Sequence, residues 1–156
     1  LEQIARNFVT GEEFYLNQNR LFLKSIVILQ NINFKNEVEI KTINPIAMRS
    51  TDIKGKYKLY EPDDQFSELI NKNLQKKWFA FKGEECSFAL EIVPIAVKKS
   101  VVWYGNRNKG CAVEGWKGTF YLKGESELLK FAYDTGLGER NSMGFGMIEM
   151  VKKEVI

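Results

Sequence analysis

The sequence predicts an α+β fold for residues 37–156, in the order strand, helix, strand, strand, helix, strand. Three observations support this prediction: an alternating pattern over residues 37–46, an amphipathic helical pattern that begins near Pro62, and a glycine-rich segment at residues 136–146. The order is typical of the split βαβ, ferredoxin-like (RRM-like) arrangement, βαββαβ, a four-stranded antiparallel sheet with two helices on one face.

The first thirty residues predict the closing elements of a preceding domain. Residues 1–9 place apolar side chains at helical spacing, and residues 14–16 and 22–29 have the composition of strands. The chain begins with Leu1, inside the helical pattern. We therefore expect three parts: the end of a mostly missing N-terminal ferredoxin-like domain (1–30), a linker (31–36) and a C-terminal domain (37–156).

The C-terminal domain is predicted to open with a strand and a long helix. Residues 37–46 alternate as a half-buried strand does, ending at Pro45, and a basic loop that contains Gly55 follows. Asp63 and Asp64 favour a helix start, because carboxylates suit the exposed amides and the positive dipole end there. The apolar face of this helix is Phe66, Leu69, Ile70, Leu74 and Trp78, the last of which we expect in the core.

Three strand segments are predicted after this helix. The first spans residues 87–95, although Pro94 limits its hydrogen bonding, and the other two span residues 101–104 and 112–122 around a polar turn. Trp103 and Tyr104 alternate along the strand, so one is expected to face the core and the other to be free to stack. We expect the two tryptophans of this region, Trp103 and Trp116, to pack in the core.

A short helix and a last strand complete the predicted domain. Ser126 is expected to cap the helix, which ends at Gly136, where a positive φ is cheapest for glycine. Residues 144–151 predict the final strand. The helix positions expected to face inward are Leu128, Leu129 and Ala132.

The charge of the chain is small in total but unevenly distributed. Its 156 residues are 44% apolar with a net charge of +3, which excludes a disordered polyelectrolyte. Residues 41–60 hold five basic residues against one acid, residues 98–123 hold six against one, and residues 61–91 hold seven acids against four lysines. Such a chain can present a basic face to nucleic acid, and solvated surface lysines explain the pattern equally well.

Metal, cofactor and membrane signals are absent from the sequence. Cys86 and Cys111 have no CxxC spacing, and the chain has no histidine, so we expect no zinc site and no cofactor. There is no signal peptide and no apolar run of membrane-spanning length, so we expect a cytoplasmic protein without a membrane partner.

The most informative motif is Gly-Leu-Gly-Glu-Arg-Asn-Ser-Met-Gly-Phe-Gly at residues 136–146. Glycines let a backbone approach a phosphate or another strand closely. A dinucleotide-binding fingerprint needs glycine at Asn141, a Walker loop needs Gly-Lys-Ser/Thr, and the RRM strand motif matches only in its Gly-Phe-Gly core. A simple connecting turn remains open. Side chains at the tip that can donate to phosphate or base edges are Arg140, Asn141 and Ser142.

In its helix–loop–strand context this motif resembles the C-terminal signature of the repeat-RNA-processing CRISPR endoribonucleases, the sixth Cas protein of the RAMP superfamily. Leu137 and Phe145 fill the hydrophobic positions of its two Gly-x-Gly pairs. Residues 42–46, Thr-Ile-Asn-Pro-Ile, resemble the first strand of that family's second domain. The resemblance covers residues 14–151.

The resemblance implies a metal-independent endoribonuclease with two ferredoxin-like domains that binds CRISPR repeat RNA. In that family the ribose 2′-hydroxyl attacks the adjacent phosphate, with His, Tyr and Lys of the first domain supplying acid, base and charge stabilisation. Because this chain has no histidine and the resemblance places the catalysts in a first domain that is mostly missing, no catalytic residue is transferred, and we expect the chain alone to be inactive. A histidine-free member of the family that uses Lys or Tyr instead stays open. Lys54 and Tyr57 in the basic loop are the weak candidates within this chain.

RNA binding transfers more directly to this chain. A basic hairpin with Lys98, Lys99, Arg107 and Lys109 is expected to contact phosphates. The glycines of the motif are expected to contact RNA, or else to pack the loop against the first domain. The predicted RNA-binding residues of the motif are Gly136, Gly138, Arg140, Asn141, Ser142, Gly144 and Gly146.

Two other functions stay open. One is a non-catalytic RNA-binding RAMP subunit of a CRISPR effector complex. The other is a ferredoxin-like ligand-binding or oligomerisation domain, with basic residues that are incidental. The expected partners are CRISPR repeat RNA and other Cas proteins, and a homodimer is compatible with the sequence.

Overall fold

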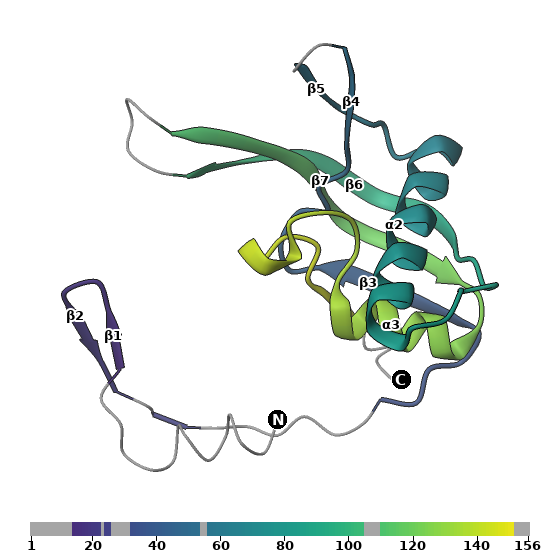
Figure 1. Ribbon diagram of the computed structural model, residues 1–156, viewed down its shortest axis with the longest axis horizontal. Coiled ribbons are helices and arrows are strands. Elements are labelled where there is room, and N and C mark those ends of the chain that lie inside the picture. Colours follow the sequence, from purple (N-terminus) through teal and green to yellow (C-terminus); the bar gives the residue numbers. More distant parts are fainter. Residues whose placement is uncertain (1–13, 23, 26–31, 54–55, 105–109, 152–156) are drawn as a thin grey trace. The chain divides into compact units, whose positions relative to one another are not determined.

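The computed structural model describes residues 14–22, 24–25, 32–53, 56–104 and 110–151 (Figure 1). The chain divides into two compact units, Leu1–Ile32 and Asn33–Ile156. In the first unit, β1 (Phe14–Leu16) pairs with β2 (Asn19–Leu21) in an antiparallel hairpin.

The structure tests the predictions for this first unit only in part. The strand predicted at residues 14–16 is confirmed as β1, whereas β2 was not predicted. The strand predicted at residues 22–29 is absent at Phe22, Lys24 and Ser25, and its other residues lie outside the described part, as does the helix predicted at residues 1–9.

The second unit contains the predicted sheet with two helices. Its strands lie in the order β6-β7-β3-β8, and every neighbouring pair is antiparallel (Figure 1). These strands are β6 (Glu91–Tyr104), β7 (Cys111–Lys123), β3 (Glu37–Thr42) and β8 (Ile148–Met150), and the helices are α2 (Asp64–Lys82) and α3 (Ser126–Thr135). Along the chain they follow the predicted order β3-α2-β6-β7-α3-β8.

Both helices pack on the same face of this sheet. The Phe66 ring of α2 stacks on Phe120 of β7, and Trp78 of α2 meets Phe131 of α3 edge-on with ring centroids 5.2 Å apart. One cluster of buried side chains joins the helices to the sheet, including Ile40, Phe66, Ile70, Leu74, Trp78, Ile92, Phe120, Leu122, Leu128, Leu129 and Ile148. Trp78 is therefore a core residue, as predicted.

Local interactions fix the ends of α2 and its link to β6. The Asp63 carboxylate accepts a hydrogen bond from the Phe66 amide at 3.1 Å, and Gly83 ends the helix with φ 77°. The Asn71 side chain both donates to and accepts from the Leu90 backbone at 2.7 Å. These bonds hold the segment before β6 against the helix.

The region predicted as one strand and a basic loop is organised differently. β3 ends at Thr42, and after a bend Ile46 bridges to Trp116 and Ala47 bridges to Glu139. The basic loop is in fact a two-stranded ribbon of β4 (Arg49–Ile53) and β5 (Lys56–Leu59). The loop prediction was wrong because Thr51 and Ile53 before Gly55 and Tyr57 after it are residues that favour strands, and the glycine permits a turn between them.

β6 and β7 form one long hairpin instead of three short strand segments. A bulge between Pro94 and Ala96 lets the pairing continue past the proline, which has no amide hydrogen to donate. The distal part of this hairpin extends beyond β3 (Figure 1). Trp103 lies there and is 72% exposed, so its predicted burial was wrong, whereas Trp116 packs on the core and donates to the Tyr60 carbonyl.

α3 and the last strand differ from prediction mainly at their ends. Ser126 is the first helical residue, and Glu125 stands at the cap without a side-chain bond. The helix ends at Gly136 with φ 79°, and its inward-facing residues are buried as predicted. β8 is shorter than residues 144–151, because Asn141–Met143 form a 3-10 turn, η1, and the chain folds into a tight loop before β8. None of the described helices is both long and apolar enough to cross a membrane.

Candidate functional site

The glycine loop, residues 136–146, packs tightly against the chain between β3 and β4. The Glu139 amide donates to the Ala47 carbonyl at 2.8 Å, and the Gly146 amide donates to the Pro45 carbonyl at 2.9 Å. A Cβ on Gly138 would stand 2.5 Å from the Ala47 oxygen, and one on Gly146 would stand 1.8 Å from the Leu137 oxygen. Both glycines also have positive φ, so close backbone approach and conformation together require them.

The two hydrophobic residues of the motif anchor the loop in different clusters. Leu137 is fully buried in the main core beneath the helices. Phe145 is buried in a second cluster with Ala47 and Val113, and its ring lies 5.8 Å from that of Tyr104. Leu137 thus fixes the loop to the core under α2 and α3, and Phe145 fixes it to the β6–β7 hairpin.

A lysine from α2 provides a further attachment. The Lys77 ammonium donates to the Gly136 and Gly138 carbonyls, each at 2.9 Å. Burial lowers the pKa of Lys77 from its usual 10.5 to about 8. The interaction holds the first Gly-x-Gly pair against the helix, and nothing in the sequence pattern indicated it.

The three tip residues predicted to bind RNA have different roles in the loop. The Asn141 amide donates to the carbonyls of Leu137 and Phe145 at 3.2 and 2.9 Å, so it closes the loop. Arg140 has φ 59°, a conformation that is costly for a side-chain-bearing residue. Among the residues that the structure describes, its guanidinium makes one weak hydrogen bond, to the Met143 sulfur at 3.5 Å, and Ser142 is exposed. Arg140 and Ser142 therefore remain available to a ligand.

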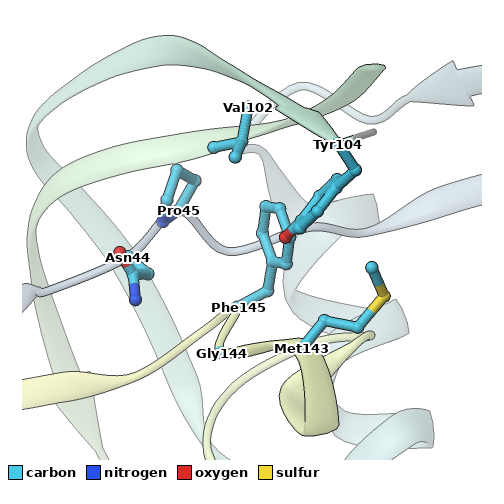
Figure 2. Close-up of a pocket in the computed structure, with 7 residues that line it drawn as sticks. All are labelled: Asn44, Pro45, Val102, Tyr104, Met143, Gly144 and Phe145. Atoms are coloured by element: carbon cyan, nitrogen blue, oxygen red, sulfur yellow. The ribbon is translucent and has the colours of Figure 1, made fainter. Parts of the chain in front are cut away.

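A small hollow lies between the glycine loop and β6 (Figure 2). Its volume is about 180 Å³. Aromatic and apolar side chains form most of its wall, and one asparagine stands at its edge. The lining residues are Asn44, Pro45, Val102, Tyr104, Met143, Gly144 and Phe145.

Three lysines gather on the sheet face away from the helices. Lys98 stands directly opposite Lys117 across β6 and β7, and with Lys41 of β3 they line a hollow of about 500 Å³. Within the described ranges, no ion pair joins any of the three to a carboxylate, including Glu149, which faces Lys41 in the register. Facing like charges are destabilising, so the arrangement favours a bound anion.

The remaining predicted cations are less informative. Lys99 lies on the other face of β6 and pairs with Glu114 at 2.9 Å. Arg107, Lys109 and Lys54 lie outside the described residues, and Tyr57 belongs to β5 without a described side chain. The sequence predicts Lys41 and Lys117 only as members of the basic stretches, because their convergence depends on strand register.

This chain is similar in sequence and fold to CRISPR-associated proteins. The family model described as CRISPR associated protein Cas6, C-terminal, matches residues 29–150. CRISPR-associated endoribonuclease Cas6 1 of Methanocaldococcus jannaschii is 33% identical over 119 residues, or 72% of this chain and 45% of that protein. This chain therefore spans about half the length of that relative.

Solved structures of CRISPR-associated proteins are also similar to this chain. The structure of a CRISPR associated protein Cas6 is similar with a TM-score of 0.77 and 28% identity, over 97% of this chain and 63% of that one. A second, described as a RAMP protein binding different RNA substrates, has a TM-score of 0.79 over 97% of this chain and 65% of that one. Its identity is 21%, so the likeness shows the shared fold.

Proposed function

This chain belongs to the Cas6 family of CRISPR-associated endoribonucleases, and we propose that it is the RNA-binding half of an enzyme that cuts CRISPR repeat RNA. The proposed reaction is the metal-independent attack of a ribose 2′-hydroxyl on the adjacent phosphate. In this proposal residues 37–156 form the C-terminal ferredoxin-like domain and residues 1–30 belong to the preceding one. The division of the chain after Ile32 supports that boundary.

The observation that best supports RNA binding is the cluster of Lys41, Lys98 and Lys117. A phosphate or two in the hollow between them would pair with ammonium groups that form no ion pair with a carboxylate in the part of the chain that the structure describes, although Glu149 faces Lys41 in the register. Lysine–phosphate contacts supply most sequence-independent affinity for nucleic acid. The lysines lie on a sheet face that the helices leave open, so an extended strand has access.

The glycine loop supplies a second contact. Arg140 is held at positive φ by a loop fixed at the backbone on both sides, and its guanidinium keeps free donors. A cation presented on a rigid loop suits phosphate recognition, because little side-chain and backbone freedom is lost on binding. Backbone strain at a position that contacts a ligand is a common feature of binding sites.

Catalysis is assigned to residues outside this chain. The chain has no histidine, and a base, an acid and a cation are needed for the 2′-hydroxyl attack. Lys54 and Tyr57 remain the candidates within the chain. We propose that the chain binds repeat RNA and leaves it uncut.

The test is a binding and cleavage assay with a labelled CRISPR repeat RNA from the source genome, in EDTA. The 156-residue chain is expected to retard the RNA in a gel without shortening it, whereas a full-length Cas6 from the same source should make one cut with a cyclic phosphate end. Cutting by the chain alone would place the catalysts within it and make Lys54→Ala and Tyr57→Phe the next variants. Absence of binding would contradict the proposal and favour the ligand-binding alternative.

A further inference from the structure

We propose that the hollow between the glycine loop and β6 binds one unstacked nucleobase of the RNA. The proposal rests on the RNA-binding function above and adds a site that reads a base, in contrast to the phosphate contacts of the lysines. At about 180 Å³ the hollow is smaller than a site for a drug-sized ligand, which starts near 300 Å³, so it admits one planar heterocycle.

The walls of the hollow suit a flat aromatic ligand. Tyr104 and Phe145 place two rings side by side, and Met143, 44% exposed, lies across from Tyr104 (Figure 2). Aromatic rings and a thioether are polarisable surfaces on which a base stacks without regard to its identity. The ring of Phe145 is buried and supports the Tyr104 ring, whose centroid lies 5.8 Å away, so the wall exists before any ligand arrives.

Polar groups at the edge of the hollow are free to read the base. Asn44 is exposed, and its side-chain amide has no hydrogen-bond partner among the residues that the structure describes; the same holds for the Tyr104 hydroxyl. An asparagine amide offers a donor beside an acceptor, the pattern that pairs with two adjacent atoms on a base edge. Recognition of unstacked bases commonly combines such an edge contact with aromatic stacking.

Gly144 differs from the other three glycines of the motif because the space beside it is open, as a base-binding site requires. A Cβ on Gly136, Gly138 or Gly146 would meet atoms of the protein at 2.7 Å or less. A Cβ on Gly144 would meet only the Asn44 amide nitrogen, at 3.7 Å, so the space beside it is open. Gly144 and Asn44 both line the hollow, so the free amide stands beside this glycine at its wall.

The hollow and the lysine cluster share one face of the β6–β7 hairpin. Side chains alternate along a strand, so Lys98, Val102 and Tyr104 point to the same side, with Lys117 and Val113 opposite them in the register. Four residues of strand separate Lys98 from Val102, or about 13 Å. One RNA strand on this face can therefore place phosphates at the lysines and a base in the hollow.

The test measures base preference by fluorescence anisotropy with labelled RNA dodecamers of adenosine, cytidine or uridine. The wild-type chain is expected to prefer its best homopolymer over its worst by at least tenfold, because a good two-bond contact discriminates by that order. Asn44→Ala should reduce this ratio below about threefold and leave the affinity for the worst homopolymer and the melting temperature unchanged. Asn33→Ala, an exposed asparagine that does not line the hollow, is the matched control.

A second pair of variants tests the stacking wall. Tyr104→Leu should weaken every homopolymer by about tenfold, and Tyr104→Phe, which keeps the ring, by less than threefold. If all homopolymers bind the wild type equally and Asn44→Ala changes nothing, the base site is wrong while RNA binding stands. If neither a homopolymer nor the CRISPR repeat RNA binds the wild-type chain, the RNA-binding function itself is overturned.

Discussion

The two Gly-x-Gly turns of the glycine loop look equivalent in sequence and are used differently in the structure. In the first, Gly136-Leu137-Gly138, a Cβ on either glycine would clash with protein atoms, Leu137 lies in the main core, and Lys77 donates to the two glycine carbonyls. In the second, Gly144-Phe145-Gly146, one glycine is the most crowded of the motif and the other faces an open hollow. A symmetric motif therefore combines a structural turn with a turn that borders a candidate binding site.

This difference follows from what each turn packs against. The first turn ends α3 and is enclosed by α2 and by the segment at Ala47. The second turn packs through Phe145 on the distal hairpin, at Val102, Tyr104 and Val113, and has open space beside Gly144. We therefore expect alanine substitutions at these glycines to change the unfolding free energy by different amounts.

The largest expected effect is that of Gly146→Ala. Its Cβ would stand 1.8 Å from the Leu137 oxygen at φ 68°, so the loop must move. Gly83→Ala is the matched control, because Gly83 has φ 77° with no atom within 4 Å of the added Cβ. We expect a loss of unfolding free energy of about 4 kcal/mol for Gly146→Ala and about 1 kcal/mol for Gly83→Ala, measured by urea denaturation. Equal losses would show that the loop has no steric need for Gly146.

The next effect is that of Lys77→Met, which leaves the Gly136 and Gly138 carbonyls without a donor. We expect a loss of about 2 kcal/mol at neutral pH, against less than 0.5 kcal/mol for the exposed neighbour in Lys76→Met. The pKa of Lys77 is about 8 in the folded protein and 10.5 in the unfolded chain. Between pH 8 and pH 10.5 the unfolded chain therefore binds more protons than the folded protein does.

The pH dependence of the unfolding free energy distinguishes the effect of the buried Lys77 amine from a loss of packing, which does not depend on pH. The contribution of Lys77 to the unfolding free energy rises as the pH rises from 8 toward 10.5. The difference in unfolding free energy between wild type and Lys77→Met, measured by urea denaturation, should therefore widen over that range. The other lysines titrate in both proteins and cancel in the difference. A gap that narrows with rising pH would contradict the burial of this amine.

The smallest stability effect is predicted for Gly144→Ala. Its φ of 87° gives the same conformational cost as at Gly83, about 1 kcal/mol, and its Cβ meets no close neighbour. Thermal and urea unfolding should therefore place this variant beside Gly83→Ala rather than beside Gly146→Ala. A loss as large as that of Gly146→Ala would mean that the second turn is enclosed and that the hollow is not open.

Local signals made the helices predictable from sequence. The spacing of Phe66, Ile70 and Leu74 has the helical period, and Asp63 and Gly136 are boundary residues whose chemistry acts within one turn. The glycine motif was also visible as a pattern. These features depend on neighbours along the chain, and they were confirmed.

The candidate site depends on distant pairing and was only partly predictable. The bulge at Pro94/Ala96 decides which face of β6 bears Lys98, and a shift of one residue would send it to the other face. Asn44 and Tyr104 line the same hollow because the glycine loop packs beside both, and no local pattern in the sequence indicates this. Trp103 was misjudged for the same reason, since its exposure depends on how far the hairpin extends beyond the rest of the sheet.

The central claim, that the open sheet face binds RNA phosphates, is tested most directly by the salt dependence of RNA affinity. Each lysine–phosphate contact contributes about 0.7 to the slope of log affinity against log salt for a single strand. Replacing Lys41, Lys98 and Lys117 by Gln should therefore reduce the slope by about 2. The control replaces the same number of lysines on the helices, Lys72, Lys76 and Lys130, and should leave the slope unchanged. Equal slopes for the two triple variants would contradict the claim.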